Sequence, residues 1–324
     1  MISDPLVIEL NVQPVADGVK FDPSAVLGAQ GKWTALNLNA VMKDTDGSET
    51  VTMVITGNGA DLKEGMLRIK VKGTTEPLDA VWNAADKSYT ISGITPEQIN
   101  ALQIQSSVAL KSDLDFAFST VDTAGTMTDT SEPIEKQVSI DIAFTNKFNG
   151  TAEDDILDAS GQSSPVNYKG GAGDDILIGG SGNDFLDGGS GANMLQGGGG
   201  NDRLVFSEDN LLMDGGADFD TLLINVANTS IDFGNFDSSV IDNMEVIDMT
   251  GNGAQSLTNL STSDVIAMTD SNNQLFINGD NADQVSLTTD FVKKQTSDQA
   301  GYSQYQSTTD STVTLYVDTD ITII

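Results

Sequence analysis

GGAGDDILI, GGSGNDFLD, GGSGANMLQ and GGGGNDRLV follow one another without a gap over residues 170–205, and this stretch decides the fold. The segment 206–214 keeps the length of nine residues but loses the glycines, and GGADFDTLL at 215–223 restores the pattern. Upstream, GTAEDDILD at 150–158 is a partial opening repeat. Self-similarity at a fixed short period predicts a solenoid in which each repeat packs on its neighbours.

The pattern within each repeat predicts a six-residue turn followed by a three-residue strand, so that two repeats form one coil of a parallel β-roll. Glycines in the turn permit positive φ and let backbone carbonyls approach a metal. The alternative is a flexible Gly/Asp-rich linker, but such a linker would not space its leucines. The eighth residue of the repeats is apolar and is predicted to point inward: Leu157, Leu177, Leu186, Leu195, Leu204 and Leu222.

Oxygen ligands dominate the chemistry that this sequence offers. The chain has no Cys and no His, which removes the common ligands of zinc, copper and haem together with Cys and Ser-His nucleophiles. Carboxylates and carbonyls remain, and these suit Ca²⁺. We therefore predict several Ca²⁺ ions in the repeats, held by Asp155, Gly171, Gly173, Asp175, Gly180, Gly182, Asp184, Gly189, Gly191, Gly198, Gly200, Asp202, Gly216, Asp218 and Asp220.

Turns that lie on the same side of the roll are two repeats apart. The first side carries the turns that begin at 179, 197 and 215, and each holds a carboxylate: Asp184, Asp202, and Asp218 or Asp220. We predict a complete series of calcium sites on this side.

The second side carries the turns that begin at 170, 188 and 206. Asn193 replaces the aspartate of the second turn, and the third turn lacks its glycine pair. We predict a truncated series here, in which Asp175 still binds together with the turn at 188. We expect Asp155 to bind with the degenerate turn at 161–164.

Charge predicts how calcium and folding are coupled. The chain has 48 Asp and Glu against 15 Lys and Arg, a formal net charge of -33. Self-repulsion of this size opposes a compact state unless cations bind. It also disfavours nucleic acid and anionic membrane surfaces as partners. No segment approaches the roughly 20 apolar residues of a membrane-spanning helix, and residues 1–10 do not resemble a signal peptide, so we interpret the start as lying inside a longer chain.

The zones on either side of the repeats are rich in strand-like runs. Residues 1–146 alternate short apolar runs with turns, which predicts an antiparallel β-sandwich. Thr95, Pro96 and Glu97 predict one short helix there. Residues 224–324 contain further runs, among them Val265–Met268, as if the solenoid continued without its calcium turns.

Two carboxylate clusters precede the repeats. Asp44, Asp46 and Glu49 surround a glycine-containing turn whose alternate oxygens suit Ca²⁺, although the pattern does not complete an EF-hand loop. Asp122 opens a similar loop that reaches Asp129. A polar hairpin loop without metal explains the first cluster equally well, and both interpretations stay open.

The repeat zone resembles RTX proteins, the calcium-dependent substrates of bacterial type I secretion. The flanking zones resemble giant RTX adhesins, including biofilm and ice-binding adhesins. The motifs 14–17, 44–49 and 116–125 look like their Ig/cadherin-like extender modules. Residues 315–324 look like an uncleaved C-terminal secretion signal, and 243–253 and 276–280 look like the region that precedes it.

This resemblance implies an all-β chain in three parts: an Ig/cadherin-like β-sandwich over 1–146, an RTX calcium β-roll over 147–223, and a β-solenoid-like cap with the secretion signal over 224–324. It implies a cell-adhesion protein at the surface of a Gram-negative bacterium. Its partners would be the ABC transporter, adaptor and outer-membrane channel of type I secretion, with further adhesin domains upstream. The chain would cross unfolded and fold outside, where calcium is abundant.

Two other functions remain: a module that binds ice, sugar or peptide, and the RTX tail of a secreted enzyme. An ice-binding roll is expected to show a regular series of Thr or Asn, but the third position reads Ala172, Ser181, Ser190, Gly199 and Ala217. For the enzyme, a Ser-His triad and a zinc protease both need the missing histidine. No carboxylate pair is marked for acid/base work, so we expect no enzymatic activity.

Overall fold

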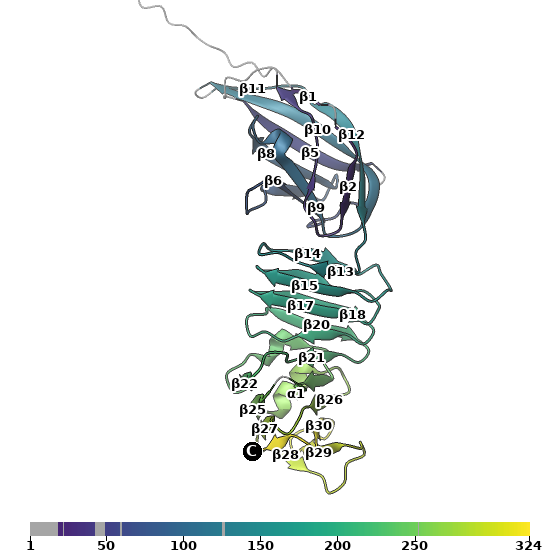
Figure 1. Ribbon diagram of the computed structural model, residues 1–324, viewed down its shortest axis with the longest axis vertical. Helices are drawn as coiled ribbons and strands as arrows, with labels where there is room; N and C mark the ends of the chain where they lie inside the picture. Colours follow the sequence, from purple (N-terminus) through teal and green to yellow (C-terminus); the bar gives the residue numbers. More distant parts are fainter. Residues whose placement is uncertain (1–18, 22, 43–48, 59, 125–126, 252) are drawn as a thin grey trace, which may run out of the picture. The chain divides into compact units, whose positions relative to one another are not determined.

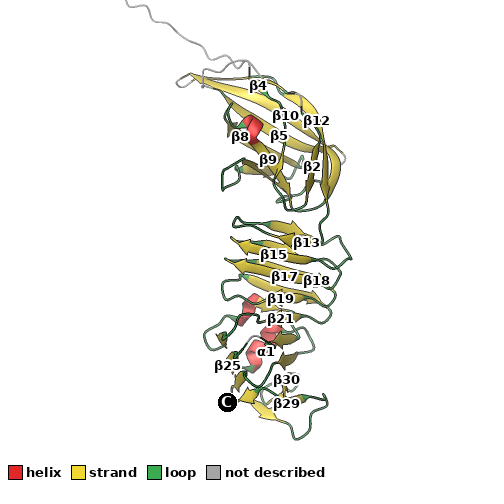
Figure 2. Cartoon of the chain, viewed as in Figure 1, coloured by secondary structure: helices red, strands yellow, loops and turns green. Residues whose placement is uncertain are grey.

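The computed structural model describes residues 19–21, 23–42, 49–58, 60–124, 127–251 and 253–324. The chain divides into two compact units, Met1–Phe144 and Thr145–Ile324. The second unit contains both the repeats and the C-terminal zone (Figures 1 and 2). None of the helices among the described residues has the length and apolar character that crossing a bilayer requires.

Three sheets make up the first unit. The largest has seven strands in the order β2-β12-β10-β5-β8-β7, with β11 paired to β10; a second has the order β3-β9-β6, and β1 pairs with β4. All pairs are antiparallel except β2 with β12. The elements are β1 (Val19–Lys20), β2 (Val26–Ala29), β3 (Thr34–Ala35), β4 (Val41–Met42), β5 (Thr50–Asn58), β6 (Leu67–Val71), β7 (Ala80–Asn83), β8 (Ser88–Ile94), η1 (Ile99–Ala101), β9 (Leu102–Ser106), β10 (Leu110–Ala124), β11 (Met127–Thr130) and β12 (Ile134–Ala143).

Both larger sheets of this unit contribute to one apolar core. Alternate residues of β5 (Val51, Met53 and Ile55) are buried in the same cluster as Ile69 of β6 and Ile104 of β9. Alternation with a period of two is the pattern of strands that cover a core on one face. The unit is therefore built as two sheets around a shared interior.

The short helix predicted near Thr95 is reduced to a turn and one 3₁₀ turn, η1. The N–H groups of Gln98 and Ile99 both bond to the carbonyl of Thr95, at 3.0 and 3.2 Å. The segment cannot extend into a longer helix because Leu102 already starts β9, where it pairs with Val71.

The second unit has three sheets. Their orders are β13-β15-β17-β19-β21-β24-β26-β30-β29-β28, β14-β16-β18-β20-β23 and β22-β25-β27-β31. The elements are β13 (Lys147–Asn149), β14 (Ile156–Asp158), β15 (Asn167–Ala172), β16 (Ile176–Ile178), β17 (Phe185–Ser190), β18 (Met194–Gly199), β19 (Arg203–Val205), β20 (Leu212–Ala217), β21 (Thr221–Leu223), β22 (Ser230–Asp232), η2 (Ser238–Val240), β23 (Ile241–Asp242), β24 (Val246–Asp248), β25 (Ser256–Leu260), α1 (Thr262–Met268), β26 (Gln274–Asn278), β27 (Gln284–Leu287), β28 (Phe291–Lys293), β29 (Tyr302–Ser307), β30 (Thr314–Asp318) and β31 (Thr322–Ile323).

The repeats form the predicted parallel β-roll. Consecutive strands alternate between two sheets, and each strand pairs in parallel with the strand two places later, as Figure 2 shows for β15, β17, β19 and β21. Leu186 pairs with Leu204, and Leu177 pairs with Leu195. Every leucine predicted to point inward is fully buried: Leu157, Leu177, Leu186, Leu195, Leu204 and Leu222.

Four of the strands are longer than predicted. β15, β17, β18 and β20 each continue through the first three turn residues, so they have six residues where the sequence pattern predicts three. The turn glycines join the parallel ladder of neighbouring coils, as Gly171 does with Gly189 and Gly198 with Gly216.

Beyond the repeats, the largest sheet continues in parallel through β24, β26 and β30. The spacing between hydrogen-bonded residues of successive coils increases from 18 residues to 25 and 28. Val265–Met268, expected as a strand-like run, instead belongs to helix α1. A capping box between Ser261 and Asp264 starts this helix, and its buried face includes Val265 and Met268.

The last two strands of the chain belong to the sheets of the second unit. Leu315 and Val317 of β30 are fully buried, and β31 pairs with β27. On its other side β30 meets the antiparallel strands β29 and β28, which end the sheet. The parallel stack therefore does not present β30 as an open edge.

Candidate metal centre

The aspartates of the first side link successive coils. Asp184, Asp202 and Asp220 are at most 2% exposed. The Oδ1 atom of each accepts a backbone N–H from the coil before it: from Val166 at 2.8 Å, from Asp184 at 2.7 Å and from Asp202 at 2.7 Å, respectively. Each of these side chains therefore uses one carboxylate oxygen for a hydrogen bond that links two coils.

The second carboxylate oxygen is left for another purpose. The Oδ2 atoms of Asp202 and Asp220 on the first side, and of Asp175 on the second side, are buried without a hydrogen-bond partner. A buried carboxylate oxygen without a partner is costly, because it has lost its water and gained nothing in return. A cation at these positions would supply the missing interaction.

In the first turn of each side, the Oδ2 atom of the aspartate accepts a hydrogen bond from a backbone N–H of its own turn. Oδ2 of Asp184 accepts the N–H of Gly180 at 2.7 Å, and Oδ2 of Asp155 accepts the N–H of Thr151 at 2.9 Å. On each side, the first Oδ2 atom without a partner therefore belongs to the aspartate of the following coil, Asp202 on the first side and Asp175 on the second.

The first glycine of each turn makes room for these oxygens. A Cβ atom added to Gly197 would lie 2.3 Å from Oδ2 of Asp202 and 2.4 Å from the carbonyl oxygen of Gly215. A Cβ on Gly179 would meet Oδ2 of Asp184 at 2.3 Å. The aspartate of the same repeat and a backbone carbonyl of the next coil thus both lie close to the first glycine of the turn. Sequence reasoning selected the second and fourth positions and missed the first.

Most of the predicted glycines at the second and fourth positions have left-handed φ angles. Gly180 and Gly182 do not, and a Cβ added to either would meet the non-repeat turn at 162–165. A Cβ on Gly198 would lie 2.3 Å from the carbonyl oxygen of Gly180, so the stacked turns leave no room for a side chain. Positive φ angles occur at Gly171, Gly173, Gly189, Gly191, Gly198, Gly200 and Gly216.

Asp155 lies in the series of the second side. Its N–H bonds to Oδ1 of Asp175 at 2.7 Å, across 20 residues. The expected pairing of Asp155 with the turn at 161–164 is therefore wrong. Two extra residues separate the opening repeat from its counterpart, and the 161–164 turn instead packs against Gly180 and Gly182 of the first side.

Asn193 keeps the link between coils but replaces the free oxygen. Its Oδ1 accepts the N–H of Asp175 at 2.9 Å, as an aspartate would. Its Nδ2 donates to the carbonyl of Gly191 and to Oδ1 of Asn210, both at 3.1 Å. The amide thus supplies the positive partner that a cation would otherwise provide.

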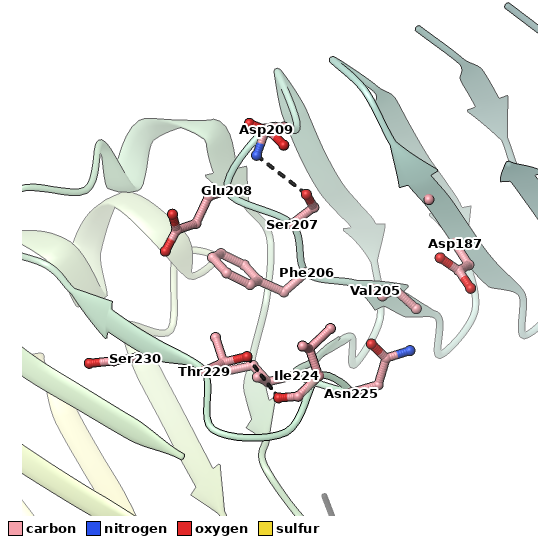
Figure 3. Close-up of a pocket in the computed structure, with 12 residues that line it drawn as sticks. Asp187, Val205, Phe206, Ser207, Glu208, Asp209, Ile224, Asn225, Thr229 and Ser230 are labelled. Atoms are coloured by element: carbon pink, nitrogen blue, oxygen red, sulfur yellow. Dashed lines mark hydrogen bonds between the residues drawn. The ribbon is translucent and has the colours of Figure 1, made fainter. Parts of the chain in front are cut away.

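On the second side of the roll, a pocket lies at the repeat 206–214, which lacks glycines. Figure 3 shows a pocket beside Phe206, with Glu208 and Asp209 at one end and Ile224 at the other. Its volume is about 640 Å³. The ring of Phe206 packs against that of Phe236, with the centroids 5.6 Å apart. An apolar wall therefore stands where a further glycine turn would have continued the series.

A second hydrogen-bond ladder runs along the outside of the turns. The fifth residue of a repeat accepts an N–H from the next coil: Asp174 from Ala192 at 2.8 Å, and Asn183 from Asn201 at 3.0 Å. Sequence reasoning missed these residues, although Asp or Asn at the fifth position in most repeats is the visible signal.

The structure resolves the choice between Asp218 and Asp220. Asp220 is the counterpart of Asp202, because its Oδ1 accepts the N–H of that residue. Asp218 stands where other repeats have their fourth residue, glycine, and it holds a left-handed φ of 82°. Its Oδ2 accepts the N–H of Gly200 at 3.1 Å.

Burial makes these carboxyl groups hard to ionise without a cation. Desolvation, together with repulsion from neighbouring carboxylates, raises the pKa of Asp175, Asp202 and Asp220 to about 7. Burial also raises the pKa of Asp184. A bound cation removes this penalty, since it favours the charged form.

The candidates before the repeats are only partly described. Asp44 and Asp46 lie outside the described residues. Glu49 is buried immediately before β5. Asp122 of β10 lies directly opposite Asp129 of β11, so these two carboxylates flank one antiparallel hairpin.

The residues of the repeats fit calcium. No group of three or more Asp, Glu, His or Cys side chains converges on one point in the described part of the chain. A metal here must therefore draw on backbone carbonyls as well as carboxylates. Such an all-oxygen set, with glycines that let the carbonyls approach, is the kind that Ca²⁺ prefers.

Comparison with known families supports this assignment. Residues 169–204 match the RTX calcium-binding nonapeptide repeat (4 copies). Residues 169–204 are thus RTX-type calcium-binding repeats, and this match supports Ca²⁺ as the cation that they bind. Neither the curated proteins nor the solved structures give a significant match.

Gly197→Ala should weaken calcium binding about tenfold or more and lower stability by about 1–3 kcal/mol, because its Cβ would displace Asp202 or the adjacent carbonyl. Gly199→Ala is the matched control, since the nearest atom to its Cβ would be 3.9 Å away. Isothermal titration calorimetry and calcium-saturated thermal unfolding measure both effects. Equal behaviour of the two variants would contradict the site.

Without calcium, the roll should become less stable as pH rises. In the folded chain Asp175, Asp202 and Asp220 keep their protons up to about pH 7, whereas in the unfolded chain they lose them near pH 4. Between these values the folded state binds more protons, so the free energy of unfolding falls with pH. Circular dichroism in calcium-stripped buffer should show more β structure at pH 5 than at pH 8.

The same protons compete with calcium, so calcium affinity should rise from pH 6 to pH 8. The control changes Asp175, Asp202 and Asp220 together to Asn, which copies the native Asn193. This variant should lose calcium at these sites and show a flatter pH profile in its metal-free form. If the stability of the metal-free variant falls with pH as steeply as that of the unmodified chain, these three carboxyl groups are not the cause of the pH dependence.

Proposed function

We propose that the chain is the calcium-dependent C-terminal module of a secreted RTX adhesin, exported unfolded and folded outside the cell when calcium binds. The observation that carries the proposal is the set of buried, unpartnered oxygens of Asp175, Asp202 and Asp220. They belong to a fold whose stacking uses the same side chains. A fold built in this way needs a cation in order to be stable.

The energetics support a switch controlled by calcium concentration. Each repeat contributes one fully buried apolar side chain at its eighth position, which is leucine except for Met213 in the repeat 206–214. The chain as a whole carries a formal net charge of -33. A ligand that binds only the folded state stabilises it by about 2.7 kcal/mol per site at 100 times its Kd. Several such sites are comparable with the whole stability of a domain, about 5–15 kcal/mol.

The packing of the C-terminal tail supports export before folding. Residues 315–324, which we propose as the secretion signal, contribute buried side chains and pair in two sheets. A transporter that reads this segment needs it free of those sheets. We therefore propose that the ABC transporter, adaptor and channel engage the chain before the C-terminal zone folds.

The first unit fits the role of a spacer. Its two sheets around one core support an Ig/cadherin-like extender module, with the target-binding domain of the adhesin located upstream. In this proposal the chain has no catalytic role. It places the adhesin at the surface of a Gram-negative bacterium, where cell adhesion and biofilm formation take place.

Calcium removal tests the switch on the full chain. At pH 7.5 with EGTA, we expect circular dichroism and limited proteolysis to show that the second unit is unfolded. Return of calcium should restore the β signal within the same sample, with a steep dependence because several sites act together. A native β signal in EGTA would refute calcium-controlled folding.

Secretion of a passenger protein tests the signal. A passenger fused to residues 224–324 should appear in the medium of cells that carry a matching type I system. Deletion of Asp318–Ile324 should reduce its export to that of the passenger alone. Export that does not depend on this tail would refute the signal assignment, while expression levels in the cytoplasm serve as the control.

A further inference from the structure

On the first side, the turn that stacks on the turn of Asp220 belongs to the C-terminal zone and contains Asn243 and Glu245. The N–H of Asp220 bonds to Oε2 of Glu245 at 2.8 Å, just as the N–H of Asp202 bonds to Oδ1 of Asp220 at 2.7 Å. The separation is 25 residues in place of 18. Glu245 of the C-terminal zone therefore takes the position of the next aspartate in the series.

The backbone of this turn also copies a repeat. A Cβ on Gly215 would lie 2.2 Å from the carbonyl oxygen of Asn243 and 2.7 Å from Oδ2 of Asp220. This matches Gly197, which faces Oδ2 of Asp202 and the carbonyl of Gly215. Asn243 adopts a left-handed φ of 51°, and its Nδ2 donates to Asp214 at 2.8 Å.

The position is buried, acidic and incompletely satisfied. Glu245 is 5% exposed and Asp220 is fully buried, yet Oδ2 of Asp220 has no hydrogen-bond partner. A pocket of about 220 Å³ opens beside Glu245, with Asp218 and Asp270 in its wall. The residues that line this pocket include no Lys or Arg that would balance these carboxylates.

We propose that the C-terminal zone completes the last cation site of the first side, the site at Asp220, for a hard divalent cation. Its protein ligands are Oδ2 of Asp220, the carbonyl oxygen of Asn243 and the carboxylate of Glu245, and Asp270 adds negative charge from the rim. The proposal deepens the calcium-dependent folding proposed above and rests on it. It makes the joining of the C-terminal zone to the roll a cation-dependent step.

The alternative is a site that holds a proton in place of a metal. Asp220 and Glu245 would then share a proton within the hydrogen-bonded turn, and no ion would bind. The two arrangements differ in the number of calcium ions that the folded chain binds, which is directly measurable.

Glu245→Gln in the full chain decides between them. The glutamine keeps the size and the hydrogen-bond acceptor but removes the charge. At a free calcium concentration that saturates the unmodified chain, equilibrium dialysis should find one ion fewer per chain. Glu208→Gln, at an exposed position on the second side, is the matched control and should bind the full number. An unchanged number of ions in Glu245→Gln would overturn the proposal.

Asp270→Asn provides the answer if Glu245→Gln does not fold in saturating calcium. Removing this one rim charge should raise the dissociation constant of a single ion about tenfold and leave the others unchanged. An unchanged isotherm would overturn the proposal. These results are distinct from failure of the proposed function, because that failure appears as a native β signal of the unmodified chain in EGTA, whatever number of ions the chain binds.

Discussion

The structure of the repeats depends on how each buried aspartate divides its two carboxylate oxygens. One oxygen accepts a backbone N–H from the preceding coil, as in the bond from Asp184 to Asp202. The other, in Asp175, Asp202 and Asp220, is buried without a partner. Stacking and metal binding therefore use the same side chain. Coils cannot stack without bringing like charges together in a low-dielectric interior, where an unpaired charge is most costly.

Two exceptions show that the two oxygens have separable roles. Asn193 retains the link to Asp175 and replaces the free oxygen with an amide that donates to Gly191 and Asn210. Glu245 retains the link to Asp220 although it comes from a longer coil. The backbone stacking is the same in both cases. Whether a turn is suited to a cation is thus decided by the atom at one position, which lets the two sides of the roll differ without a change of fold.

The sequence was sufficient wherever its nine-residue period holds. The buried leucines, the parallel roll and the equivalence of Asp184 and Asp202 follow from the period, because identical spacing forces identical placement. The predictions failed where the spacing changes. The nine-residue period places Asp155 at the wrong turn because its coil has 20 residues, and it does not reveal Glu245 because that coil has 25. Val265–Met268 was read as a strand because its four residues alone do not reveal the capping box that starts α1 at Ser261.

Under the proposed function, the C-terminal zone has to meet two requirements that cannot be met at the same time. In the folded unit, β30 is covered on one side by β26 and on the other by β29, so Leu315 and Val317 are inaccessible. Under the proposed function the same segment is the part that the transporter reads. Within this proposal both requirements are met if recognition precedes folding, and calcium-dependent folding provides that order, because the proposal places recognition inside the cell and calcium binding outside it. The antiparallel strands β28 and β29 then close the end of the sheet, which protects an otherwise exposed parallel stack from further pairing.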